Sequence, residues 1–244
     1  MNPIKISKGK TALPPRLFIY GVAGIGKTTL GASIPGAVVM PIEEGADAID
    51  CAKMDRPADI EGVINAINAL CDDAQGFSTL VIDSVTAMEQ LIWQAICKEN
   101  KWGSIESPGF GRGYVASSEL WRHILDRLTS LRKAQGMSIV LVGHVEIKTV
   151  NAPDSEPFDR YQPRLHKIPC AMLTEWSDAL LFAHHEKNVI TDEKTGKTRA
   201  VGSGARVIKT TERPSHLAKN RYGMPDEIPM SYECIIASIN KAFA

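Results

Sequence analysis

A glycine-rich segment near the start of the chain constrains its fold more than any other feature. Residues 21–28 read Gly-Val-Ala-Gly-Ile-Gly-Lys-Thr and match the pattern G-x-x-x-x-G-K-[ST] at every fixed position. The apolar run at 16–20 predicts a β-strand before this loop, and residues 27–33 predict a helix that ends at the Ile-Pro-Gly turn of 34–36. The order of strand, loop and helix indicates an α/β fold.

The same loop has the chemistry to hold the phosphates of a nucleotide. Glycines let the backbone approach closely, so that successive N–H groups can surround the β-phosphate. Lys27 would reach the β- and γ-phosphate oxygens, and the Thr28 hydroxyl would complete the shell of a Mg²⁺ ion. A plain glycine-rich turn with an exposed lysine is the alternative, but it would not require the flanking strand and helix. We expect ATP and Mg²⁺ to bind through Gly21, Val22, Ala23, Gly24, Ile25, Gly26, Lys27, Thr28 and Thr29.

The rest of the chain alternates between strand and helix patterns. Short apolar runs predict further strands at 37–40, 79–82, 138–142, 178–182 and 207–210. Apolar residues at helical spacing predict helices at 60–70, 85–96, 120–131 and 231–242. This alternation is typical of a mostly parallel central β-sheet that is covered by helices on both faces.

Composition limits the class of protein. The 244 residues are 44% hydrophobic and 23% charged, which suits one folded domain over 1–244. Because 28 basic and 28 acidic residues balance, any contact with nucleic acid must come from a local patch. The five cysteines include no C-x-x-C pair, and no run has the length of a bilayer span or the order of a signal peptide. We therefore expect reduced thiols, no membrane contact and a cytoplasmic location.

Several segments depart from the regular pattern of this domain. We expect an N-terminal extension at 1–15, long loops rich in glycine or proline at 103–114 and 145–170, and a β-hairpin at 186–210. Long loops in a compact domain are usually functional or mobile.

Acidic residues follow two of the predicted strands. Asp83 ends the run at 79–83, where P-loop enzymes place the carboxylate that holds Mg²⁺ through water, although an aspartate there can also cap the next helix. Because Asp83 lies downstream of the glycine loop, the metal-binding role is favoured over the helix cap. Thr28 and Asp83 are therefore the predicted metal ligands. Glu43 and Glu44 follow the strand at 37–40, where a carboxylate could activate water beside the γ-phosphate. Two solvated loop acids are the open alternative.

These motifs together resemble the RecA core of P-loop ATPases. The resemblance covers roughly 16–228 and rests on the glycine loop, Ile42-Glu43-Glu44-Gly45, the run at 80–84, the polar residue after 138–143, and Lys219-Asn220-Arg221. The chain looks most like the short RecA-core ATPases of bacteriophages that are linked to single-strand annealing and recombination. The resemblance implies a RecA-like fold and points to Glu43 ahead of Glu44 as the general base. Pro41 departs from the family, which often has an acidic residue or threonine there, so the alignment of the base stays open.

The resemblance also implies roles for three further residues. His144 occupies the position of a polar sensor of the γ-phosphate, and a neutral imidazole can donate one hydrogen bond and accept another. A strand-end histidine bonded to backbone is the alternative. Lys219 and Arg221 are similar to the K-x-R element of ring ATPases, whose cations reach across a subunit interface to the neighbour's γ-phosphate. That role requires an oligomer, whereas a simple basic turn would not.

The two long loops fall where RecA-like proteins carry their DNA-binding loops. The segment 103–114 places Arg112 among glycines beside Phe110 and Tyr114, a composition that can follow a backbone and stack on bases. The segment 145–170 carries both basic and acidic residues, so charge alone does not establish DNA binding, and contact with other subunits is the alternative. The candidate DNA-binding residues are Arg112, Lys148, Arg160, Arg164 and Lys167.

We therefore expect a Mg²⁺-dependent ATPase that binds single-stranded DNA as a ring or filament and serves recombination, annealing or repair. A ring-forming motor or loader that remodels a protein or helicase partner would share every active-site residue. A nucleotide-dependent switch with negligible turnover is a third reading, whereas a small-molecule kinase would need a cluster of lid arginines that the sequence lacks. Recombination or replication proteins are the expected partners, and the host cytoplasm is the expected location if a phage encodes the chain.

Overall fold

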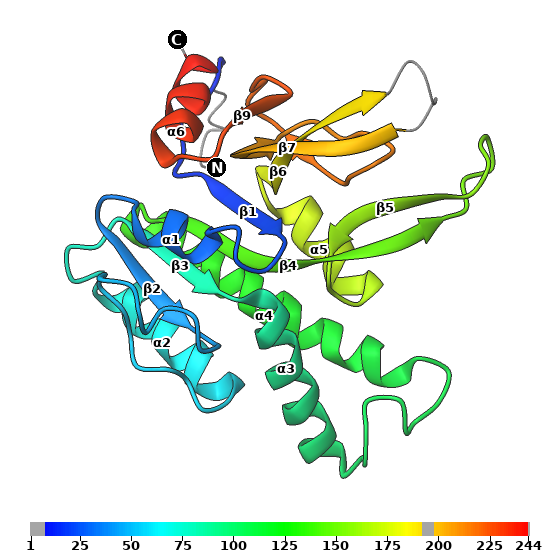
Figure 1. Ribbon diagram of the computed structural model, residues 1–244. Coiled ribbons are helices and arrows are strands. Elements are labelled where there is room, and N and C mark those ends of the chain that lie inside the picture. Colours follow the sequence, from blue (N-terminus) through cyan, green and yellow to red (C-terminus); the bar gives the residue numbers. More distant parts are fainter. Residues whose placement is uncertain (1–7, 192–197, 244) are drawn as a thin grey trace.

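The computed structural model describes residues 8–191 and 198–243. In chain order these residues form β1 (Arg16–Gly21), α1 (Lys27–Ala32), β2 (Ala37–Pro41), α2 (Ile60–Asp72), β3 (Thr79–Asp83), α3 (Val85–Asn100), α4 (Arg112–Gln135), β4 (Ser138–Val150), β5 (Phe158–Pro163), α5 (Lys167–Trp176), β6 (Ala179–Thr191), β7 (Thr198–Lys209), β8 (Lys219–Asn220), β9 (Glu227–Pro229) and α6 (Tyr232–Lys241) (Figure 1).

The strands form one sheet in the order β2-β3-β4-β1-β6-β7-β9, with β5 paired to β4 and β8 paired to β6. The strands from β2 to β6 in this order run parallel, and β5, β7, β8 and β9 pair antiparallel with their neighbours. Strand β4 lies between β1 and β3, so one strand separates the glycine loop from Asp83. This mostly parallel sheet confirms the expected fold class.

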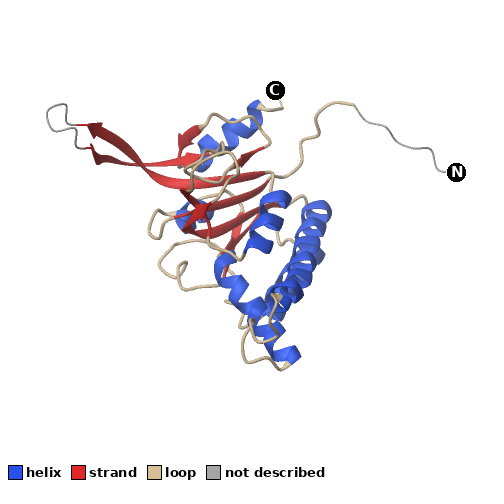
Figure 2. Ribbon diagram, turned by 90° about the vertical axis from the view of Figure 1, so that its right-hand side faces the viewer, coloured by secondary structure: helices blue, strands red, loops and turns tan. Residues whose placement is uncertain are grey.

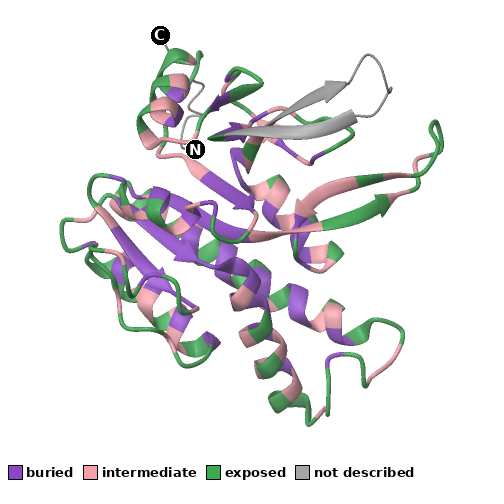
Figure 3. Cartoon of the chain, viewed as in Figure 1, coloured by how far each residue is buried: buried purple, intermediate pink, exposed green. Residues whose placement is uncertain are grey.

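Alternate residues of β1 face two different hydrophobic clusters, as the pleat of a strand requires. Phe18 and Tyr20 pack in a cluster with apolar residues of α2, α3, α4 and α5. Leu17 and Ile19 pack in a second cluster with residues of α1 and α6. Figure 3 shows buried residues concentrated along β1, β2 and β3. Helices therefore cover both faces of the sheet, which is the arrangement that the strand-helix alternation predicts.

The segment 145–170 is not the long loop that its prolines predict. Strand β4 continues to Val150 and pairs antiparallel with β5, with Lys148 opposite Arg160, and α5 begins at Lys167. The alternation of apolar and polar residues from Val145 to Lys148 suits a strand, and the first prolines fall in the turn. Pro169 lies in the first turn of α5, where the missing N–H breaks no helical hydrogen bond.

The second expected loop, 103–114, is shorter than predicted because α4 begins at Arg112 after Gly111 in a left-handed conformation (φ 70°). The expected hairpin at 186–210 corresponds to the antiparallel pair β6–β7, and its expected tip at 192–197 lies outside the described residues. Figure 2 shows this pair extending as a two-stranded ribbon away from the helices.

Among the helices of the described ranges, none combines the length and the apolar character needed to cross a bilayer.

Candidate active site

The glycine loop turns from β1 into α1 through backbone positions that only glycine fills easily. Gly26, the residue before α1, has φ 97°, in the left-handed region. A Cβ on Gly21 would lie 2.3 Å from the carbonyl oxygen of Ala183 on β6, which is closer than atoms can approach. The positive φ of Gly26 and the lack of space at Gly21 explain why the pattern requires glycine at these two positions.

Lys27 is folded back onto this loop. Its Nζ donates hydrogen bonds of 2.9 Å to the carbonyl oxygens of Gly21 and Val22, and its side chain is buried. Burial lowers the pKa of Lys27, while the nearby carboxylates of Asp83 and Glu43 act in the opposite direction. These electrostatic contributions indicate that Lys27, Asp83 and Glu43 lie close together at the end of the sheet, with Arg164 also near Lys27.

Thr28 and Asp83 supply the oxygen atoms expected of a metal site. Thr28 Oγ1 donates a hydrogen bond of 2.5 Å to Asp83 Oδ2. Asp83 ends β3 and is 4% exposed, and burial raises the pKa of its carboxyl group. A hydroxyl and a carboxylate are hard oxygen ligands that Mg²⁺ prefers. The donor set therefore fits the nucleotide and metal expected from the sequence.

The two adjacent glutamates after β2 lie in different surroundings. Glu43 Oε1 lies 2.9 Å from His144 Nε2, and the backbone N–H of Glu43 donates to the carbonyl oxygen of Asp83 at 3.4 Å. Glu44 is an exposed side chain that forms an ion pair with Arg56 at 3.2 Å. Only Glu43 of this pair is therefore directed into the site with Lys27 and Asp83.

His144 stands at the end of the regular part of β4, beside Gly21 in the register of β1 and β4. Its backbone N–H donates to Thr86 Oγ1 at 3.0 Å, which fixes the strand end against α3. The hydrogen bond from His144 lowers the pKa of Glu43 and outweighs the opposing effect of burial. This contact keeps the Glu43 carboxylate ionised near neutral pH and able to accept a proton.

The structure holds Lys219 and Arg221 far from the glycine loop of their own chain. Lys219 Nζ donates to three carbonyl oxygens at the end of α5, those of Thr174, Glu175 and Ser177, at 2.7 to 2.8 Å. Arg221 Nη1 lies 3.2 Å from Asp178, and its side chain is about half exposed. The β6–β8 pairing puts Lys219 beside Leu180, near the start of β6, whereas Gly21 lies beside Ala183 further along it. Both cations are therefore held near the start of β6 and the end of α5, away from the end of β1 that leads into the glycine loop.

Three of the five candidate DNA-binding residues line one cavity of about 810 Å³ next to the site. Lys148, Arg164 and Lys167 share its wall with Glu43. The backbone N–H of Arg164 donates to the carbonyl oxygen of His144 at 2.9 Å, so the cavity and the site are joined through the backbone. Arg160, by contrast, is ion-paired with Glu212.

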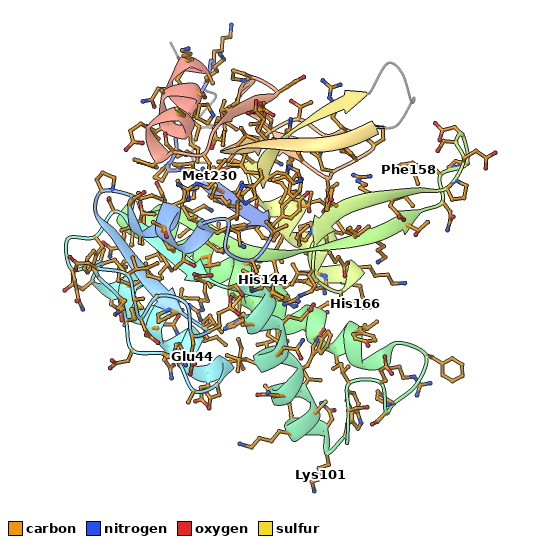
Figure 4. All side chains as sticks on the ribbon, in the orientation of Figure 1. Glu44, Lys101, His144, Phe158, His166 and Met230 are labelled. Carbon is orange, nitrogen blue, oxygen red and sulfur yellow. The ribbon has the colours of Figure 1, made fainter. Side chains whose placement is uncertain are left out.

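The remaining candidate, Arg112, begins α4 and lies 6.0 Å from the ring of the exposed Phe110. Two residues further on, Tyr114 stacks on His166 with ring centres 3.9 Å apart. The segments 103–114 and 145–170 therefore meet, although one face of Tyr114 is covered by this stack. Figure 4 shows His144 and His166 on the same side of the molecule, with Glu44 set apart toward α2.

Glu89 is a buried carboxylate that sequence reasoning did not single out. It lies on α3, is 4% exposed, and accepts hydrogen bonds of 3.0 and 3.3 Å from the backbone N–H of His166. Burial raises the pKa of Glu89 to about 7. The sequence does contain one indication of this site. Glu89 falls on the same face of the predicted helix as Val85, Met88 and Ile92, and a carboxylate on a buried face is unusual.

Comparisons with known proteins identify a family for the chain. Residues 13–222 match the family described as an AAA domain. No curated protein matches the chain. Among solved structures, the crystal structure of the RadB recombinase is similar at a TM-score of 0.45 and 16% sequence identity, over 84% of this chain and 86% of that chain. Since the AAA domain match spans most of the sequence and includes the loop, Asp83 and His144, the chain belongs to the AAA domain family.

Proposed function

We propose that the protein binds ATP with Mg²⁺ through residues 21–29 and hydrolyses it with Glu43 as the general base. The observation that carries this proposal is the convergence of Glu43, Lys27 and Asp83 at the carboxyl ends of β1, β2 and β3. Glu43 is hydrogen-bonded to His144, and its charge acts on the pKa of Lys27. A cation for phosphate, oxygen ligands for metal and an ionised base are the groups that this hydrolysis requires.

Each side chain has a distinct part in this proposal. Lys27 exchanges the carbonyl oxygens of Gly21 and Val22 for β- and γ-phosphate oxygens. Thr28 and Asp83 hold Mg²⁺, which neutralises charge on those oxygens when it is bound. Glu43 orients the attacking water and takes its proton, and His144 keeps the Glu43 carboxylate ionised and directed toward the loop.

The proposed ligand of the ATPase is single-stranded DNA, bound by an oligomer in recombination, annealing or repair, as for the phage ATPases that the sequence resembles. The cavity that Lys148, Arg164 and Lys167 share with Glu43 supports this choice. Basic side chains at this place can bind the phosphates of DNA close to the proposed general base. Arg164 is connected directly to the site, because its backbone N–H donates a hydrogen bond to the carbonyl oxygen of His144. In an oligomer, the exposed part of Arg221 is available to a neighbouring chain.

A protein-remodelling ATPase is a second candidate, and a specific observation favours it. The same cavity is also lined by Glu43 and Glu146, so carboxylates accompany its cations, and the whole chain carries no net charge. Such a mixed surface suits a protein partner better than a polyanion.

The test is ATP hydrolysis measured with and without single-stranded DNA across a range of protein concentrations. We expect turnover that requires Mg²⁺, rises with protein concentration and is stimulated by DNA. Absence of nucleotide binding would overturn the ATPase proposal. Hydrolysis without any DNA binding at low salt would reject the DNA assignment and leave the protein-remodelling candidate, whereas tight ATP binding with no turnover under any condition would indicate a switch.

A further inference from the structure

Arg206 on β7 reaches the glycine loop from a strand that belongs to none of its motifs. The guanidinium Nη1 lies 3.3 Å from the carbonyl oxygen of Ile25. A Cβ placed on Gly26 would lie only 2.5 Å from the same Nη1, so the guanidinium rests against the bare face of that glycine. The side chain is otherwise exposed. Arg206 therefore lies at the rim of the loop that receives phosphate.

The strand order explains how a residue so late in the chain comes to this place. β6 lies between β1 and β7, and Arg206 pairs with His185 just beyond the point where β6 accompanies Gly21. On its other side, the backbone N–H of Met230 donates to the carbonyl oxygen of Arg206 at 3.0 Å. His185 and Met230 thus fix the backbone of Arg206 on both sides, and this backbone position places the Arg206 side chain at the loop. Figure 4 labels Met230 next to this part of the sheet.

Arg206 has few polar contacts among the residues that the structure describes. Among the side chains that the structure describes, no carboxylate forms an ion pair with it, whereas Lys209 on the same strand pairs with Glu227 and Arg213 pairs with Asp226. Within the described residues, the guanidinium donates to the Ile25 carbonyl oxygen alone, and this long bond uses one of its five N–H donors. An unpaired guanidinium with free donors is the group best matched to phosphate oxygens.

We propose that Arg206 is a nucleotide-binding residue, whose guanidinium contacts the phosphate chain of the nucleotide held by residues 21–29. This inference rests on the proposed ATP site and adds a second cation to it, on the side opposite to the Glu43–His144 pair. Lys27 enters the site from within the loop, and Arg206 approaches the loop from outside, so the two charges act on the phosphates from different directions.

The experiment measures the dissociation constants of MgATP, MgADP and pyrophosphate by calorimetry at several salt concentrations. The variants are Arg206→Gln, Arg206→Lys and, as the matched control on the same strand, Lys209→Gln. We expect Arg206→Gln to weaken all three ligands about tenfold and to reduce the salt dependence, because a charge-assisted hydrogen bond is lost. Arg206→Lys restores part of the affinity because it keeps the charge, and Lys209→Gln binds like the wild type.

Each other outcome has one meaning. Normal affinity of Arg206→Gln for the three ligands would overturn this inference and leave the proposed ATP site intact. Equal losses in Arg206→Gln and Arg206→Lys with unchanged salt dependence would also overturn it, since they would show that the side chain only braces the loop through Ile25. If the wild type binds none of the ligands, the proposed function itself is overturned and the inference falls with it.

Discussion

His144 Nε2 and Glu43 Oε1 are 2.9 Å apart, although 101 positions separate the two residues in the chain. The sheet register brings them together, because Pro41 of β2, Asp83 of β3 and Val142 of β4 are aligned across neighbouring strands. Glu43 and His144 each follow this row by two residues, so both side chains emerge at the same edge. The carboxyl ends of β2 and β4 therefore build one half of the site, and the glycine loop builds the other.

Replacement of Glu43 by glutamine separates binding from hydrolysis. We expect Glu43→Gln to bind ATP normally and to hydrolyse it about 10²-fold to 10³-fold more slowly, because an amide cannot take the proton from water. Phosphate release and nucleotide affinity are the measurements. Glu44→Gln is the matched control, since Glu44 pairs with Arg56, and it should retain activity. An inactive Glu44→Gln beside an active Glu43→Gln would move the base by one position.

Removal of His144 shifts the pH dependence of hydrolysis. The hydrogen bond from His144 is the main cause that lowers the pKa of Glu43, so His144→Ala raises that pKa. Glu43 acts as a base only when ionised, and the acid limb of the rate profile therefore moves to higher pH. His144→Gln keeps a donor and should shift the limb less. An acid limb at the same pH in His144→Ala would contradict the proposed pairing.

Glu89 makes the stability of the protein depend on pH near neutrality. Burial raises the pKa of Glu89 to about 7, above the value of about 4.3 for an unfolded glutamate. The folded protein therefore binds this proton more tightly, and the resulting stabilisation is complete below about pH 4.3 and is lost as the pH rises through 7. We expect Glu89→Gln to raise the free energy of unfolding at pH 8 by roughly 2 kcal/mol relative to the wild type.

Denaturant unfolding at a series of pH values measures this difference for Glu89. The control is Glu119→Gln on α4, whose exposed carboxylate pairs with Arg122 and should leave the pH dependence unchanged. A Glu89→Gln variant that is less stable than the wild type at pH 8 would show that the ionised carboxylate is needed by a cation of the neighbouring cavity.

Arg112 tests DNA contact at the start of α4. Arg112→Ala should weaken association with single-stranded DNA and reduce the slope of the logarithm of affinity against the logarithm of salt concentration by about 0.7, the value for one lost phosphate contact. Hydrolysis without DNA should not change. Arg122→Ala, further along the same helix, is the control. Equal slopes for Arg112→Ala and the wild type would remove Arg112 from the DNA surface.

Lys219 and Arg221 should behave differently. All three donors of Lys219 are used at the end of α5, so Lys219→Met should lower the stability of the protein.

Arg221→Ala should bind ATP yet hydrolyse it about 10³-fold more slowly if its guanidinium completes the site of a neighbour. A mixture of Lys27→Ala and Arg221→Ala would then recover activity. No recovery in mixtures that exchange subunits would rule out the action in trans.

The sequence by itself determined the features that depend on local order. The fixed glycines, Lys27 and Thr28 predict a phosphate-binding loop, because the roles proposed for them depend on backbone conformation within a few residues. The alternation of strand and helix patterns predicts the parallel sheet, since period and turn chemistry are also local. The same reasoning failed over 145–170, where prolines in a turn and at the start of α5 obscured a hairpin and a helix.

Only the tertiary structure decided which side chains meet. Glu43 and Glu44 are neighbours with identical chemistry, and their difference comes from His144 on one side and Arg56 on the other. Lys219 at the end of α5 and Arg206 at the glycine loop are likewise placed by strand pairing. Such contacts depend on register and strand order across the sheet, which join residues distant in the chain, and no local pattern encodes which distant partner a side chain finds.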